Sequence, residues 1–129
     1  MTVLLDTHIF LWFVQNDPKL PARWFDFIET SGFRFLVSHV VPWEISIKHG
    51  LGKLKLDRRP SELFPEQVAA NGFDFLPFSL SHVLRQGDLP LHHGDPFDRL
   101  LVAQCLVERV KIISLDPQMA PYGVVMSEP

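Results

Sequence analysis

The sequence predicts an α/β fold, a three-layer α/β/α sandwich around a parallel central sheet. Short apolar runs of strand-like composition alternate with longer segments whose apolar residues recur at helical spacing. The helical segments can supply the crossovers that successive parallel strands require, and such crossovers are right-handed. Because 129 residues is the size of one ordinary domain, we expect a single domain over residues 1–129.

The first half of the chain contains two predicted strands and three predicted helices. The apolar run that ends at Val14 is typical of a buried helix, and Asn16-Asp17-Pro18 stops it. A later helix tolerates Pro42 because proline fits the first turn, and Gly50 and Gly52 end that helix. In chain order we expect a strand over residues 2–5, helices over 9–14 and 22–30, a strand over 33–37 and a helix from 40 to about 50.

The second half adds three helices and two strands. Asn71-Gly72 indicates a turn, Ser79 has the character of an N-cap, and Asp95-Pro96 opens the most strongly patterned helix of the chain. Asp116-Pro117 breaks the last apolar strand. In chain order we expect a helix over residues 60–70, a strand over 73–76, a short helix from 79 to about 84, a loop over 87–94, a helix from 95 through 107 and a strand over 111–115.

Four acidic side chains stand where a predicted strand ends or a predicted helix begins. Carboxylates gathered at the carboxyl edge of a parallel sheet repel one another unless a hard cation such as Mg²⁺ neutralises them. Capping alone could explain three of them, because aspartates favour helix starts, but Glu44 lies inside an apolar helix, where an ionised side chain is costly. The candidate metal ligands and catalytic residues are Asp6, Glu44, Asp98 and Asp116.

The composition sets limits on partners and compartment. Cys105 is the only cysteine, which excludes a disulfide framework and fits a reducing cytoplasm. The apolar N-terminal run is too short for a membrane span, and we expect no membrane association. The net charge of −3 argues at first against nucleic acid, but the rest of the chain carries +1 once the four candidate ligands are set aside. A hydrophobic fraction of 47% favours a partner protein or a homodimer.

Four segments recur in the order known from one protein family. They read LLDTHIFLW, VPWEISIKHGLGKLKL, HHGDPFDRLLVAQC and IISLD. Together they resemble PIN-domain ribonucleases, and more closely the VapC-type toxins of bacterial type II toxin-antitoxin modules. The resemblance implies an endoribonuclease dependent on Mg²⁺ or Mn²⁺, which hydrolyses RNA with metal-activated water and is inhibited by a small VapB-type antitoxin.

The resemblance also assigns residues within these segments. Asp95 is either the helix cap alone or a contact to a metal through water, and Ser114 corresponds to a small hydroxyl residue near the last acid. Gly94 departs from the family, in which a basic residue is usual, so a phosphate contact there is in doubt. The family's four acids match Asp6 after the first strand, Glu44 in the WEI helix, Asp98 before the L-x-A helix and Asp116 after the last strand.

Other functions remain as alternatives. A degenerate PIN-like scaffold could bind RNA or protein without cutting, although the intact acidic quartet argues against it. An aspartyl phosphatase would need a second aspartate two residues after Asp6, where His8 stands. A dinucleotide-binding fold is excluded by the lack of a G-x-G-x-x-G motif after the first strand.

The sequence allows two interpretations for several further side chains. His92 and His93 fit exposed loop residues or RNA contacts better than a zinc site, and His8 is expected at the edge of the site. A basic segment is either a phosphate contact or a solvated helix end; its members are Lys48, Lys53, Lys55, Arg58 and Arg59. An aromatic set is either an exposed groove or core, the latter being the commoner case; its members are Trp12, Phe13, Trp24 and Phe25.

Overall fold

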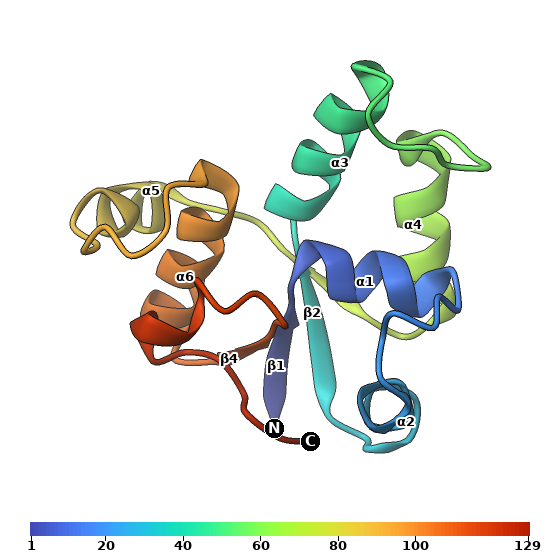
Figure 1. Ribbon diagram of the computed structural model, residues 1–129, viewed down its shortest axis with the longest axis horizontal. Coiled ribbons are helices and arrows are strands. Elements are labelled where there is room, and N and C mark those ends of the chain that lie inside the picture. Colours follow the sequence, from blue (N-terminus) through green and yellow to red (C-terminus); the bar gives the residue numbers. More distant parts are fainter.

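A computed structural model describes residues 1–129 and contains one four-stranded, wholly parallel sheet (Figure 1). The spatial order of the strands is β3-β2-β1-β4, so the two central strands are flanked on both sides. The sequence prediction of an α/β sandwich with a parallel sheet is confirmed. The strands are β1 (Thr2–Leu5), β2 (Arg34–Ser38), β3 (Asp74–Leu76) and β4 (Lys111–Ile113).

Helices lie on both sides of the sheet. In Figure 1, α5 and α6 stand on one side of the strands and α1, α2 and α4 on the other, while α3 rises from the carboxyl end of β2. The helices are α1 (Thr7–Val14), α2 (Ala22–Thr30), α3 (Val40–Gly50), α4 (Pro60–Ala70), α5 (Leu80–Gly87) and α6 (Pro96–Glu108), followed by the short 3-10 helix η1 (Ala120–Tyr122).

Two element boundaries differ from the sequence prediction in a way that shapes the site. The first helix begins at Thr7 rather than Ile9, because the Asp6 carboxylate accepts the Thr7 N–H and caps the helix. The last strand ends at Ile113 rather than Leu115, because Ser114 turns its hydroxyl toward Asp6. Both differences place polar groups beyond the ends of β1 and β4, where apolar residues alone would have continued the elements.

The core fills both sides of the sheet. Leu4 on β1 and Ile112 on the adjacent strand β4 are fully buried, as is Phe10 on α1. Trp24 and Phe13 are also buried, which confirms the core interpretation for half of the aromatic set. No helix in the structure is both long enough and apolar enough to cross a membrane.

The C-terminal segment covers the outer edge of β4. Val125 forms a parallel bridge with Ile112, whose N–H donates to the Val124 carbonyl at 2.9 Å. The Met126 N–H donates to the Ile112 carbonyl at 2.8 Å. The strand at that side of the sheet therefore has backbone partners on both of its edges.

Candidate metal centre

The candidate site lies at the carboxyl ends of β1 and β4, the two strands between which the order of strands in the sheet changes direction. From β1 the chain adds β2 and β3 on one side, whereas β4 joins on the other, so a crevice opens beyond the carboxyl ends of β1 and β4. Asp6 follows β1 directly and Ser114 follows β4 directly. The Ser114 hydroxyl donates to Asp6 Oδ2 at 2.6 Å and accepts the Asp116 N–H at 3.2 Å. This serine therefore links two of the four predicted acids, Asp6 and Asp116.

Asp6 is a buried carboxylate with two local donors. Its Oδ1 accepts the Thr7 N–H at 2.7 Å, and 5% of the residue is exposed. Burial raises the pKa of Asp6 and outweighs the opposing effect of the hydrogen bonds from Ser114 and Thr7. Each oxygen keeps a lone pair, so the carboxylate can still face a cation in the crevice.

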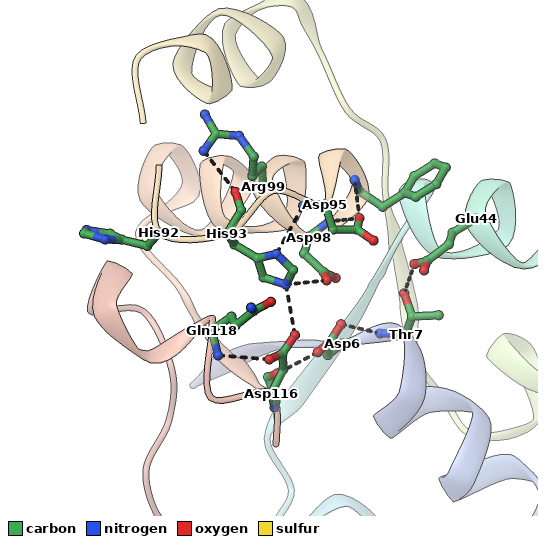
Figure 2. Close-up of polar contacts among 12 residues, drawn as sticks. Asp6, Thr7, Glu44, His92, His93, Asp95, Asp98, Arg99, Asp116 and Gln118 are labelled. Atoms are coloured by element: carbon green, nitrogen blue, oxygen red, sulfur yellow. Dashed lines mark hydrogen bonds and ion pairs between the residues drawn. The ribbon is translucent and has the colours of Figure 1, made fainter. Parts of the chain in front are cut away.

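Asp98 lies in the first turn of α6, and the helix start orients it. The Asp95 carboxylate caps this helix by accepting the N–H groups of Phe97 at 2.8 Å and Asp98 at 3.1 Å. Asp95 thus acts as the N-cap, one of the two roles expected from the sequence. The Asp98 side chain then points toward Asp6 and Asp116 (Figure 2).

The protonation of Asp98 reflects crowding of negative charge. Burial, the largest cause, and the charges of Asp6, Asp95 and Glu44 together raise the pKa of this carboxyl to about 7, and the neighbouring His93 opposes them. Without a cation, Asp98 would therefore hold a proton over part of the neutral range. Clustered negative charge that raises a carboxyl pKa also favours the binding of a cation, so this pKa shift is typical of a candidate cation site.

His93 lies between two of the acids. The sequence allowed an exposed loop residue or an RNA contact, and the exposed alternative is wrong, because only 8% of the residue is exposed. Its Nε2 lies 2.9 Å from Asp98 Oδ2 and 2.9 Å from Asp116 Oδ2. Its Nδ1 accepts the Asp95 N–H at 3.1 Å, so the neutral ring carries its proton on Nε2. His93 is therefore a donor to both carboxylates (Figure 2).

The burial of His93 depends on a long-range polar cluster around Arg99. The Arg99 guanidinium is buried and donates to backbone carbonyls of the last turn of α5 and of the loop that connects α5 to α6. The Tyr122 hydroxyl accepts the His93 N–H at 2.9 Å and donates to Pro90 O at 2.9 Å. The carbonyls that Arg99 binds belong to Gln86, Leu89, Pro90 and His93.

Both carboxylate oxygens of Glu44 already have side-chain partners within the chain. Only 3% of it is exposed, its Oε1 accepts the Thr7 hydroxyl at 2.7 Å, and its Oε2 pairs with Lys48 Nζ at 2.6 Å. Burial lowers the pKa of Lys48, but the hydrogen bond and charge of Glu44 outweigh that effect and the net shift is upward. Lys48 is therefore firmly cationic at the wall of the site.

Most of the predicted basic segment is neutralised within the chain. Three of its five members form ion pairs, and only Lys53 and Lys55 stay exposed without one. The pairs are Lys48 with Glu44, Arg58 with Glu66, and Arg59 with Glu62.

The donor set suits a hard divalent cation. One ligand atom from each of His93, Asp98 and Asp116 lies within 4.8 Å of the others. Asp6 shares the wall of a cavity of about 260 Å³ with Asp116. Carboxylate oxygens are the ligands that Mg²⁺ and Mn²⁺ prefer. Asp98 and Asp116 could therefore hold such an ion, and Asp6 lies on the wall of the adjoining cavity; His93, with its proton on Nε2, contacts both Asp98 and Asp116.

A parallel sheet with carboxylates clustered beyond the carboxyl ends of β1 and β4 defines an α/β protein with an acidic candidate metal site. The comparisons give the family. The PIN domain profile matches residues 3–124, and the chain belongs to the PIN-domain family. PIN domains are generally nucleases and typically use divalent metals.

A solved structure has the same fold. It is the crystal structure of VapBC2 from Rickettsia felis bound to a DNA fragment from their promoter. The similarity has a TM-score of 0.71 and 15% sequence identity, and it covers 98% of this chain and 96% of the other. The comparison with curated proteins finds no match.

Proposed function

We propose that this chain is a PIN-domain endoribonuclease dependent on Mg²⁺ or Mn²⁺, and the toxin of a type II toxin-antitoxin module. The observation that carries the proposal is the convergence of Asp6, Asp98 and Asp116 on one crevice, with the pKa of Asp98 raised to about 7. Three acids from distant parts of the chain meet where the strand order reverses. Capping explains Asp6 and Asp95 locally, but it does not explain why Asp98 and Asp116 meet at one histidine.

In this proposal each residue of the site has a defined task. Asp6, Asp98 and Asp116 hold the cation, and the Ser114 and His93 donors fix the orientation of those carboxylates. Glu44 adds negative charge from the wall and places Lys48 close to the crevice, where a cationic side chain can meet an RNA phosphate. The bound ion supplies water activation and charge neutralisation at the scissile phosphate.

The activity test is direct. The purified protein should cleave single-stranded RNA in Mg²⁺ or Mn²⁺ and lose that activity in EDTA. Asp6→Asn and Asp98→Asn should each reduce cleavage at least 100-fold, whereas Asp26→Asn on the exposed face of α2 should not. Full activity of both site variants would refute the assignment. It would favour the alternative, an inactive PIN-like scaffold that binds RNA or protein.

The toxin role is tested separately in cells. We propose a cytoplasmic protein of one domain whose expression arrests growth, with relief by a VapB-type antitoxin encoded beside it. The similarity in fold to a chain of VapBC2 supports this partner. Arrest that Asp98→Asn abolishes and the neighbouring protein relieves is the expected result, and normal growth on expression would argue against a toxin.

A homodimer is also proposed, from the apolar side chains that the fold leaves exposed. Trp43 stacks on Phe78 at 5.9 Å, and both rings are exposed. Val83 on α5 lines a groove with these two rings, and Leu80 and Leu84 on the same helix are also exposed. Sedimentation should show a dimer that Leu84→Glu dissociates; a monomeric wild-type protein would disprove it.

A further inference from the structure

We propose that the cavity beside the acidic centre is a stacking pocket for one unpaired nucleobase of the RNA, with Trp12 as its platform. This inference rests on the proposed function, which it deepens by saying how the substrate strand is held. The cavity has a volume of about 260 Å³. It is lined by Asp6, His8, Ile9, Trp12, Leu115 and Asp116.

The position of Trp12 on its helix is the first step of the argument. Helix α1 directs its other large side chains inward, with Ile9, Phe10 and Phe13 buried. Trp12 lies on the outer face, one turn after the exposed His8, and the two rings are 5.5 Å apart at an interplanar angle of 32°. The half-buried indole packs in part against the core, and it also forms part of the cavity wall.

The second step is the composition of the walls. The apolar part consists of Ile9, Trp12 and the exposed Leu115, whereas the polar part consists of His8 and the two carboxylates of Asp6 and Asp116. Anionic groups such as phosphate are repelled by those two carboxylates unless a cation intervenes. A nucleobase is neutral and flat, and it can lay its face on an indole while its sugar and phosphate lie outside the cavity.

The third step is continuity with the acidic centre. Asp6 and Asp116 belong both to the cavity wall and to the set that would hold the cation. A base seated against Trp12 therefore lies next to a backbone phosphate positioned at the centre. Because stacking uses the base face and not its hydrogen-bonding edge, the pocket selects unpaired strands and tolerates different bases.

Cleavage kinetics provide the first test. Trp12→Ala should raise KM for a short single-stranded RNA about 10-fold or more with kcat nearly unchanged, because stacking binds ground state and transition state alike. Trp12→Phe should restore most of the affinity, since a phenyl ring still stacks. Phe75→Ala, which removes an exposed aromatic ring outside the cavity and outside the proposed dimer surface, is the matched control and should leave KM unchanged. An unchanged KM for Trp12→Ala would overturn the proposal and leave the nuclease assignment standing.

A second measurement does not depend on cleavage. In the Trp43→Phe protein, Trp12 is the remaining exposed indole, since Trp24 is buried. Cytidine and adenosine monophosphates should quench its fluorescence in a saturable manner, and Trp12→Phe should remove that signal. Absence of quenching would overturn the pocket. Quenching in a protein that cuts no RNA would refute the nuclease function alone.

The same variants discriminate a protein occupant from a nucleobase. If Trp12→Ala leaves RNA binding intact but weakens binding of the protein encoded beside this chain, the cavity takes a protein segment and the nucleobase proposal is wrong. Circular dichroism and urea unfolding of each variant establish whether Trp12→Ala is folded. If Trp12→Ala does not fold, the comparison of Trp12→Phe with the wild-type protein still tests the proposal.

Discussion

Asp98→Asn should stabilise the cation-free protein, and it should do so more strongly as the pH rises. Burial and neighbouring charges raise the pKa of Asp98 to about 7 in the folded state. Its value in the unfolded chain is ~3.9, so the folded protein binds the Asp98 proton more tightly. The stability that this proton contributes is fully present below pH ~4 and is lost as the pH rises to about 7.

The size of the effect follows from that difference. A separation of about three pH units corresponds to about 4 kcal/mol at pH 8, and about 2 to 3 kcal/mol of it develops between pH 5 and pH 8. Only 16% of the Asp98 side chain is exposed, so solvent does not screen most of this cost. Asparagine stays neutral and still accepts the His93 hydrogen bond, so it avoids the loss.

Urea unfolding in EDTA, followed by the fluorescence of buried Trp24, measures this prediction. The advantage of Asp98→Asn over wild type should grow by about 2 to 3 kcal/mol from pH 5 to pH 8. Asp26→Asn, on an exposed face, is the control and should show no such growth. Adding Mn²⁺ at pH 8 should then stabilise wild type by about 3 kcal/mol at 100 times Kd, and stabilise the variant much less. Equal pH dependence of wild type and Asp98→Asn would refute the electrostatic reasoning.

Three further predictions concern stability and use the same unfolding assay. Arg99→Leu should lower the free energy of unfolding by at least about 3 kcal/mol, because buried carbonyls of the loop that carries His93 lose their hydrogen-bond donor. Removing the exposed ion pair of Arg34 with Asp74 should lower it by less than about 1 kcal/mol. Lys48→Met should cost about 1 to 3 kcal/mol by leaving the buried Glu44 carboxylate without its cation, and a cost near zero would show that water replaces the amine. Leu101→Ala should cost about 2 to 5 kcal/mol because the side chain is fully buried in the core, a value that a loss below 1 kcal/mol would contradict.

The sequence predicted the acidic residues of the site because their positions follow from local rules. Asp6 and Asp116 come after apolar strands, and the carboxyl ends of parallel strands share one edge of the sheet. Asp98 stands in the first turn of a helix whose cap and proline are visible in the sequence. The periodicity of the strands and helices was therefore sufficient to predict that these three carboxylates lie near one another.

The sequence did not predict the role of His93, because its burial depends on contacts between distant segments. Arg99 and Tyr122 gather the loop around it, and Tyr122 lies 29 residues away in the chain. A signal was present in the buried arginine that follows Asp98, since an arginine inside an apolar helix needs several acceptors nearby. The Glu44–Lys48 pair was also accessible from the i, i+4 spacing of the two residues.

Backbone pairing between Ile112 and residues 124–126 limits which truncations and affinity tags the C-terminal segment tolerates. Removing residues 124–126 would free the Ile112 N–H and C=O at the outer edge of β4, and a neighbouring copy could extend the sheet through them. Affinity handles placed after Pro129 leave these hydrogen bonds in place, and preparations truncated before Val124 should polymerise on storage more readily than the 129-residue chain.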